Sequence, residues 1–476
     1  MKLATFPKEC KIAKLKPLFK KGSSTDAKNY RPISLLPQIS KILEKVVLEK
    51  TQVYLKENNL IYELQSGFRD QHSTNMCLSY LSDKILSGFD SGLLTGMILI
   101  DLQKAFDTID HNILLKKMKI IGFSESTIKW FQSYLTERIF FVSVEKSLSN
   151  AGKLKCGVPQ GSILGPLLFL LYINDIKQAS ESTLLLYADD SCILYQSNNT
   201  KEIETQLNHD FNNLCNWFID NKLSIHLGED KTKCILFGPK YRKKETRNLN
   251  ILYKDLKIQQ YSSVTYLGCI LDDTMTGEDM ALFVIKKINS KLKFLYRKQT
   301  FFSKPLRRML CNAIIQPHFD YACTGWYSNL STKLKKKLQV TQNKCIRFCL
   351  QKANRTHIGY EEFLEINWLP VSARAQQMVL CCIFVFFQKA CPVFISKLFS
   401  TVGNKTINTR SSKSRLLQPK RKTNAGINCL SYSGPSQWNK LPIKLKATTS
   451  LNSFKHSVKK YFFDQIRNGL TPLFKY

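Results

Sequence analysis

Thr183-Leu-Leu-Leu-Tyr-Ala-Asp-Asp-Ser-Cys-Ile-Leu-Tyr195 places two adjacent carboxylates, Asp189 and Asp190, between two apolar stretches. Each flank is typical of a buried β-strand, so the pattern predicts a strand, a tight turn and a second strand. A further apolar run, Met97-Ile-Leu-Ile-Asp101, also ends in an acid. Unpaired charge is costly to bury, so several acids at the ends of buried strands indicate a balancing cation. Three such carboxylates can hold two divalent metal ions for phosphoryl transfer.

The size and charge of the chain indicate its class of partner. Its 476 residues leave room for two to four domains of roughly 150 residues each. A hydrophobic content of 43% can supply a core. The net charge is +35, from 71 Lys and Arg against 36 Asp and Glu. A surplus of this size favours nucleic acid as a partner over a basic but inert surface.

The C-terminal 86 residues, 391–476, are the most basic part of the chain. They contain sixteen Lys and Arg and one acidic residue, Asp464. Aromatic residues are interleaved with them, including these eight: Phe394, Phe399, Tyr432, Trp438, Phe454, Tyr461, Phe462 and Phe463. This composition suits neutralisation of a nucleic-acid backbone and stacking on its bases. Most of these aromatic residues are nevertheless expected in the core, since the C-terminal helices need apolar side chains to bury.

The cysteines and the apolar runs bear on the compartment. Fifteen cysteines are scattered without the paired spacing of a zinc site. We therefore expect free thiols and a reducing, intracellular environment. We expect no signal peptide and no membrane partner, because the longest apolar runs, around 163–173 and 378–387, are too short to span a bilayer.

Periodicity predicts mixed α and β structure, with helices dominating the second half. Helices are predicted over residues 40–56, 74–86, 113–121, 124–135, 200–220, 279–299, 303–316, 331–351 and 371–390. Strands are predicted over 97–101, 139–145, 153–158, 233–237 and, as a pair, around 252–271. Residues 159–176 are expected to form a Gly-rich turn followed by an apolar helix, and residues 1–36 short extended pieces.

Seven ordered motifs extend the argument beyond the acidic turn, because an isolated Asp-Asp pair would more often be a solvated turn. They are Asn29-Tyr-Arg-Pro-Ile-Ser-Leu-Leu-Pro37, Gln65-Ser-Gly-Phe-Arg69, Asp101-Leu-Gln-Lys-Ala-Phe-Asp107, Gly157-Val-Pro-Gln-Gly-Ser-Ile-Leu-Gly-Pro166, Tyr187-Ala-Asp-Asp190, Lys231-Thr232 and Tyr266-Leu-Gly268. In this order they resemble the polymerase core of a reverse transcriptase of the non-LTR, jockey-like retrotransposon type. Gly434-Pro-Ser-Gln-Trp-Asn-Lys-Leu-Pro442 resembles the tail of the same family.

The resemblance implies an α+β right-hand polymerase. Fingers and palm would occupy residues 1–270, a helical thumb 271–390, and a basic nucleic-acid-binding region 391–476. The implied reaction is RNA-templated addition of deoxynucleoside monophosphates to a DNA 3′ end. Its partners would be an RNA template, a DNA primer or target, and deoxynucleoside triphosphates, and its implied place of action is the nucleus.

The resemblance also assigns the catalytic and metal residues. Asp101, Asp189 and Asp190 would hold two Mg²⁺ ions roughly 3.5–4 Å apart, with the backbone carbonyl of Leu102 as a further ligand. Carboxylate oxygens suit the hard Mg²⁺ ion. Lys231 matches a lysine that protonates the departing pyrophosphate, although the stretch 223–231 is longer than in the family and lacks its common Asn.

The resemblance also assigns residues that would contact the nucleotide, the template and the primer. Lys20, Lys21 and Arg31 match positions that grip the incoming triphosphate. Phe106 matches an aromatic that blocks a 2′-hydroxyl, and Gln160 and Gly161 match a turn beside the nascent base pair. Arg69 would contact the template or the fingers, or form a surface salt bridge. Tyr266, Leu267 and Gly268 would hold the primer end. Asp107 and Asp110 are expected to be structural or capping groups, because neither ends the strand.

Two alternatives remain open. One is a group II intron-type reverse transcriptase, which also carries Tyr-Ala-Asp-Asp. The other is a catalytically inactive relic that binds nucleic acid, since the motifs begin close to the start of the chain and no endonuclease domain precedes them. The intact carboxylates favour the enzyme, whereas the short N-terminal part favours the relic.

Overall fold

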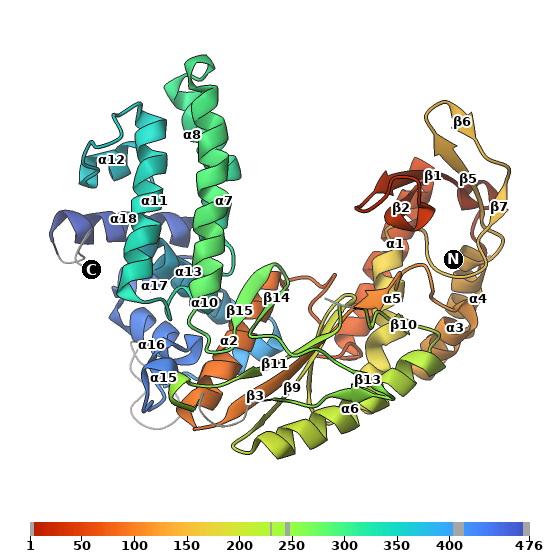
Figure 1. Cartoon of the computed structure of the whole chain (residues 1–476). Helices are drawn as coiled ribbons and strands as arrows, with labels where there is room; N and C mark the ends of the chain where they lie inside the picture. Colours follow the sequence, from red (N-terminus) through yellow and green to blue (C-terminus); the bar gives the residue numbers. More distant parts are fainter. Residues whose placement is uncertain (1–3, 229–230, 243–247, 403–413, 470–476) are drawn as a thin grey trace.

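The computed structural model describes residues 4–228, 231–242, 248–402 and 414–469. Figure 1 shows two lobes that rise from a central sheet, with the fingers in one lobe and the thumb helices in the other. The arrangement matches the expected right-hand fold of mixed helix and sheet. Within the described parts of the chain, no helix is both long and apolar enough to cross a bilayer.

The palm is a four-stranded antiparallel sheet. Its order is β11 (Lys233–Phe237), β3 (Leu94–Ile100), β9 (Asp190–Ser197) and β8 (Thr183–Tyr187). All seven residues of β3 are buried, because this central strand is covered on both faces. The sheet therefore provides a rigid platform for the residues at its ends.

Alternate residues of the palm strands belong to two separate cores. Met97 and Leu99 of β3 pack in the core that includes α2 (Thr74–Asp90) and the thumb. Ile98 and Ile100 pack in the core that includes α6 (Thr200–Asp220). This alternation follows from the two-residue repeat of a strand. Figure 1 shows α6 along the face of the sheet away from the thumb.

The fingers contain a second, mixed sheet. Strand β1 (Ile12–Phe19) pairs antiparallel with β2 (Tyr30–Leu35) and parallel with β5 (Ile139–Val144). Short β6 (Ser147–Leu148) and β7 (Gly152–Lys153) pair with β5. Helices α1 (Gln38–Glu57), α3 (His111–Ile120), α4 (Glu125–Leu135) and α5 (Gly165–Ile173) lie in this half of the chain.

The strand predicted over 153–158 is wrong beyond its first residue. Strand β7 ends at Lys153, and residues 154–158 have no strand assignment. The backbone of this segment is instead bonded to the loop after β4 (Leu102–Gln103), since the Val158 N–H donates to the Phe106 carbonyl at 2.9 Å. The backbone of this segment therefore bonds to a loop, whereas the sequence pattern had predicted pairing within a sheet.

A hairpin and a set of helices complete the thumb side. Strands β14 (Ser263–Tyr266) and β15 (Cys269–Asp272) form the hairpin. The three strands that precede it in the sequence are short: β10 (Ser224–Ile225), β12 (Leu252–Tyr253) and β13 (Leu256–Lys257). The main helices are α7 (Glu278–Arg297), α8 (Lys304–Ile314), α11 (Thr332–Leu350) and α13 (Val371–Phe387). Short helices α9 (Gln316–Asp320), α10 (Cys323–Trp326), α12 (Tyr360–Glu365) and α14 (Val393–Ser396) connect them.

The C-terminal helices share the core of the thumb. They are α15 (Asn424–Asn428), α16 (Leu430–Lys440), α17 (Ile443–Lys446) and α18 (Leu451–Arg467). Of the eight aromatic residues, six are buried in this core: Phe394, Phe399, Trp438, Phe454, Phe462 and Phe463. The core position expected for most of these aromatic residues is therefore confirmed for these six, because helices of this length need apolar side chains to bury. Tyr432 and Tyr461 are half-buried.

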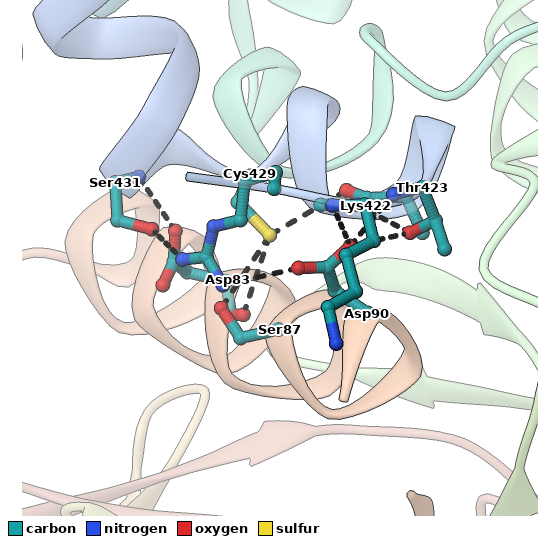
Figure 2. A network of polar contacts seen from close by, with 10 residues as sticks. Asp83, Ser87, Asp90, Lys422, Thr423, Cys429 and Ser431 are labelled. Carbon is teal, nitrogen blue, oxygen red and sulfur yellow. Dashed lines mark hydrogen bonds and ion pairs between the residues drawn. The ribbon is translucent and has the colours of Figure 1, made fainter. Parts of the chain in front are cut away.

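Two acids of α2 fasten the C-terminal region to the palm, as Figure 2 shows. Asp90 Oδ1 accepts from the backbone N–H groups of Lys422 and Thr423 at 2.9 and 2.8 Å, and from the Thr423 hydroxyl at 2.8 Å. Asp83 Oδ1 accepts from the Ser431 N–H at 2.7 Å. Residues more than 300 positions apart are thus joined by polar contacts, of which the bond between Asp83 and Ser431 is buried.

Candidate active site

The three predicted metal-binding acids come together at one end of the palm sheet. Strand β9 begins at Asp190, and Asp189 lies in the turn that joins β8 to β9. The antiparallel register of β3 and β9 pairs Ile100 with Ser191. Asp101 directly follows the end of β3, and its charge acts on Asp190. Their role as metal ligands stays a prediction.

Residues of the Gln65-to-Arg69 motif contact the backbone of the acidic turn and fix its position. Ala188 at the start of the turn has a left-handed φ of 57°, which is uncommon for a residue with a side chain. The Gln65 Oε1 accepts from the Ala188 N–H at 3.1 Å and from the Gly67 N–H at 2.9 Å. A Cβ on Gly67 would lie 2.3 Å from the Ala188 nitrogen, so only glycine fits there.

The acids crowd one another electrostatically. Burial raises the pKa of Asp190 to about 6, and the nearby charges of Asp189 and Asp101 add to this rise. The side chain still reaches solvent, because Asp190 is exposed at the end of the sheet. A raised pKa here means that the folded chain holds negative charge in an unfavourable place, and a bound cation would relieve it.

Asp101 has two basic partners of its own. Its Oδ2 lies 2.9 Å from the Lys231 Nζ and 3.3 Å from the His226 Nδ1. Lys231 was predicted at this site from the sequence, whereas His226 was not. His226 lies next to Asp101 because β10 pairs with β4, which sets Ile225 opposite Leu102. The two residues of β10, Ser224 and Ile225, are too few to give a periodic strand signal in the sequence.

The donor set suits a hard divalent cation. Among the described residues, no three His, Cys, Asp or Glu side chains are already arranged as ligands of one ion. Asp101 Oδ2 instead contacts Lys231 and His226. The three clustered carboxylates nevertheless have the oxygen chemistry that Mg²⁺ requires, so the residues present fit this ion.

The predicted nucleotide-binding turn touches both the fingers and the loop after β4. The Gln160 carbonyl accepts from the Ser34 N–H of β2 at 2.8 Å, and its side chain donates to Asp107 at 2.8 Å. Gly161 has a φ of 109°, and a Cβ there would lie 3.0 Å from the Ser34 oxygen. The turn is thus held between the two elements expected to surround the nucleotide.

Phe106 lies within a cluster of aromatic rings. Its centroid is 4.7 Å from that of Phe169, which is fully buried, and 5.9 Å from that of Phe68, which is half exposed. Phe106 itself is half-buried. The ring therefore has a fixed base and an accessible edge, as a residue that selects against a 2′-hydroxyl would need.

The other residues predicted to contact substrate differ from one another in exposure and in hydrogen bonding. Lys20, Lys21 and Arg31 are all exposed near the turn between β1 and β2. The Arg69 guanidinium donates at 2.9 Å to the carbonyls of Tyr62 and Gln65, which orients the loop that carries it. The Leu102 side chain is buried and its strand pairs with β10. The contacts of these residues with substrate remain predictions.

In the hairpin predicted to contact the primer, Tyr266 is buried and the two turn residues are more exposed. The Tyr266 side chain is buried in the palm and thumb core, so it supports the hairpin and cannot itself reach a primer. Leu267 and Gly268 form the turn, with φ values of 46° and 77°. The Tyr321 hydroxyl donates to the Leu267 carbonyl. Of the three residues predicted to hold the primer end, only Leu267 and Gly268 in this turn therefore remain candidates for the contact.

Asp107 and Asp110 are structural, as expected. Asp110 caps α3 by accepting from the N–H groups of Asn112 and Ile113 at 2.9 and 3.0 Å. Asp107 accepts from the Gln160 side chain. The contacts of both acids therefore organise loops around the site.

Comparison with known proteins identifies the family. Residues 19–271 match the family model described as "Reverse transcriptase (RNA-dependent DNA polymerase)". The chain is 28% identical over 360 residues to the probable RNA-directed DNA polymerase from transposon BS of Drosophila melanogaster, covering 73% of this chain and 39% of that protein. It is 29% identical over 280 residues to the RNA-directed DNA polymerase from mobile element jockey of the same species, covering 57% and 30%.

The chain spans about two fifths of the length of the first of these relatives. Among solved structures, it aligns with telomerase from Candida tropicalis in complex with a fragment of telomeric RNA at a TM-score of 0.40, with 14% identity over 83% of this chain and 64% of that one. The family model covers more than half of the chain, and the transposon polymerases extend the match into the thumb. The chain therefore belongs to the reverse transcriptase (RNA-dependent DNA polymerase) family, with relatives among jockey-like non-LTR retrotransposons.

Proposed function

We propose that this chain is an RNA-directed DNA polymerase that extends a DNA 3′ end with deoxynucleotides on an RNA template. The observation that carries the proposal is the convergence of Asp101, Asp189 and Asp190 at the end of the palm sheet, within a chain of this family. The template, the primer and the deoxynucleoside triphosphates come from the family, and so does action in the nucleus. The net charge of +35 supports a nucleic-acid partner.

The metal part of the proposal rests on the same three acids. Asp101, Asp189 and Asp190 would hold two Mg²⁺ ions, and the Leu102 carbonyl would assist. Such ions activate the primer hydroxyl and stabilise the charge that develops on the reacting phosphate. The raised pKa of Asp190, caused by burial and by the charges of Asp189 and Asp101, supports a cation at this place.

Lys231 has a defined task in this scheme. Its Nζ is held 2.9 Å from Asp101 Oδ2, and only about a third of its side chain is exposed. An ammonium group in this position is available to donate a proton to a leaving pyrophosphate as a general acid. His226 shares the same carboxylate oxygen, so it helps to orient Asp101.

Substrate selection would be the work of the surrounding loops. Phe106 would meet the sugar of the incoming nucleotide, while Gln160 and Gly161 lie beside the base pair. Lys20, Lys21 and Arg31 would neutralise its phosphates, for which exposed cations at a hairpin end are suited. The transposon relatives support this assignment, and none of the findings supports the group II intron-type alternative.

A primer-extension assay tests the proposal. The native chain and the Asp189→Ala/Asp190→Ala variant are compared on an RNA template with a DNA primer, deoxynucleotides and Mg²⁺. Asp220→Ala is the matched control, because it removes an exposed acid at the end of α6. Extension by the native chain and the control alone supports the polymerase. If no protein extends the primer while RNA binding persists, the chain is a nucleic-acid-binding relic.

A further inference from the structure

A cavity of about 240 Å³ lies in the thumb lobe, between helices that come from distant parts of the chain. Arg308 and Asn312 line it from α8, Gln316 from α9, Arg374 and Gln377 from α13, and Lys459 from α18. Residues of the palm and fingers do not line it. The cavity is therefore separate from the carboxylate site.

The charge of this cavity is strongly one-sided. Three of its lining residues are cationic and none is acidic. Asp320 balances only Arg374, with Nε–Oδ1 and Nη2–Oδ2 distances of 2.9 and 2.8 Å. Within the described parts of the chain, Arg308 and Lys459 form no ion pair with a carboxylate. The exposed Arg308 and the half-buried Lys459 thus line one cavity without a carboxylate counter-ion.

The cations are held in place and still have donors to offer. Arg374 uses three N–H groups, two on Asp320 and one on the Gln377 Oε1 at 2.7 Å. A guanidinium has five, so two remain. The Lys459 ammonium donates to the Asn367 carbonyl and has two further hydrogens. Asn367 itself has a left-handed φ of 57°, so the rim of the cavity is fixed by an unusual backbone.

Two further observations favour a bound anion with a hydroxyl group. Burial lowers the pKa of Lys459 to about 8, and the like charges of Arg374 and Arg308 add to this fall, which a bound anion would reverse. The Gln316 Oε1 is buried without a hydrogen-bond partner among the described residues. A ligand hydroxyl would satisfy this acceptor, since an unpaired buried polar atom costs about 1–3 kcal/mol.

We propose that this cavity is a phosphate-binding site, in which Arg308, Arg374 and Lys459 hold the phosphate of a hydroxyl-bearing ligand. About 10–15 Å³ of such space holds one water molecule, so the cavity has room for a phosphate together with part of a sugar. The source that fits best is the backbone of an RNA strand, because the chain is strongly basic and RNA carries a hydroxyl beside each phosphate. A free phosphorylated molecule has the same chemistry. The site does not depend on polymerase activity.

The test removes the two unbalanced cations in Arg308→Gln/Lys459→Gln. The matched control, Lys333→Gln/Lys336→Gln, removes two exposed cations from α11. Binding of a fluorescein-labelled single-stranded RNA is measured by anisotropy over a range of salt concentrations. Each lost phosphate contact lowers the slope of log K against log salt by about 0.7 for a single strand. Because the two cations contact a single phosphate, the first variant is expected to lose about 0.7 more than the control.

A second arm distinguishes the source of the phosphate. The melting temperature of each protein is compared in inorganic phosphate and in chloride of equal ionic strength. Stabilisation by phosphate that the cavity variant loses, with an unchanged RNA slope, would assign the site to a free phosphorylated molecule. The charge-preserving Arg308→Lys/Lys459→Arg variant should retain binding, which separates loss of charge from misfolding. Equal RNA slopes and equal phosphate effects in the cavity variant and the control would overturn the proposal.

Discussion

At the scale of single residues, Asp190 shows a conflict between stability and function. Its pKa is raised to about 6 by burial and by Asp189 and Asp101, so deprotonation is harder in the folded than in the unfolded chain. The charged form therefore destabilises the metal-free fold above about pH 6, and this penalty disappears below the ordinary pKa of 3.8.

Asp190→Asn is expected to stabilise the metal-free protein while removing polymerase activity. We predict a gain of about 1 kcal/mol at pH 8, reduced from the full effect of the shift because water screens this exposed side chain. The gain should vanish at pH 4. Chemical denaturation at both pH values checks this, with Asp220→Asn as the control. A stability loss at pH 8 would show that the acids do not repel one another in the fold.

Phe106 determines the choice of sugar if its predicted role is correct. Phe106→Ala would open space beside the 2′ position, since the ring sits on buried Phe169 and presents a free edge. We expect the preference for deoxynucleotides over ribonucleotides to fall roughly 10- to 100-fold, the range for loss of one steric contact. Single-nucleotide insertion kinetics measure the ratio. An unchanged preference with normal extension would assign Phe106 to the core alone.

At the scale of elements, the Gln65-to-Arg69 loop fixes the position of the acidic turn. Gly67→Ala would place a Cβ 2.3 Å from the Ala188 nitrogen and must displace the turn. A displacement near 1 Å at a catalytic site costs about 100-fold in rate. The control is Gly92→Ala, which strains a positive φ of 76° but meets nothing within 4 Å. Extension rates at matched folded fractions separate the two, and equal rates would refute the coupling.

The elements that the sequence predicted best are those with strong local patterns. The apolar run before Asp101, the turn at 188–189 and the periodic helix α6 all appear at or near the predicted residues. The segment 153–158 was predicted wrongly because its partner is a loop distant in sequence. His226 was missed for the same reason: its contact with Asp101 depends on pairing between two-residue strands, which leave no periodic signal.

At the scale of the whole molecule, the C-terminal region is a docked part of the thumb and palm. Burial alone would raise the pKa of Asp90, but hydrogen bonds from Thr423 and Lys422 and the charge of Arg421 outweigh it and lower the pKa. This carboxylate therefore stabilises docking above its ordinary pKa, and the contribution is lost as the pH falls through the lowered folded value.

Asp90→Ala is expected to loosen this docking. The substitution leaves the N–H groups of Lys422 and Thr423 without their acceptor and removes a partner of Arg421. We predict a loss of about 2–3 kcal/mol in the free energy of unfolding, the range for hydrogen bonds to a charged group. Limited proteolysis should then release the C-terminal region faster. Asp464→Ala, which removes an exposed acid of α18, is the control and should behave as the native chain.

The sequence favoured the core for most of the C-terminal aromatic residues, but composition could not show which of them are buried. Basic and aromatic residues alternate in a stacking surface and in an amphipathic helix alike, and only the tertiary partners distinguish the two. Trp438 shows this, since its ring stacks on Phe387 at 4.9 Å and its Nε1 donates to the Ser414 carbonyl at 2.8 Å. The cationic cavity was equally hidden, because its residues lie on four separate helices.

The central claim is that Asp101, Asp189 and Asp190 act together in RNA-templated DNA synthesis. The most direct measurement is the single-turnover rate of nucleotide addition to a DNA primer on an RNA template, with Asp101→Asn compared to Asp220→Asn. The account predicts normal addition by the native chain and by Asp220→Asn, and a loss of at least about 100-fold in Asp101→Asn, because the carboxylate contributes to catalysis at the reacting centre. Addition by Asp101→Asn at the native rate would contradict it.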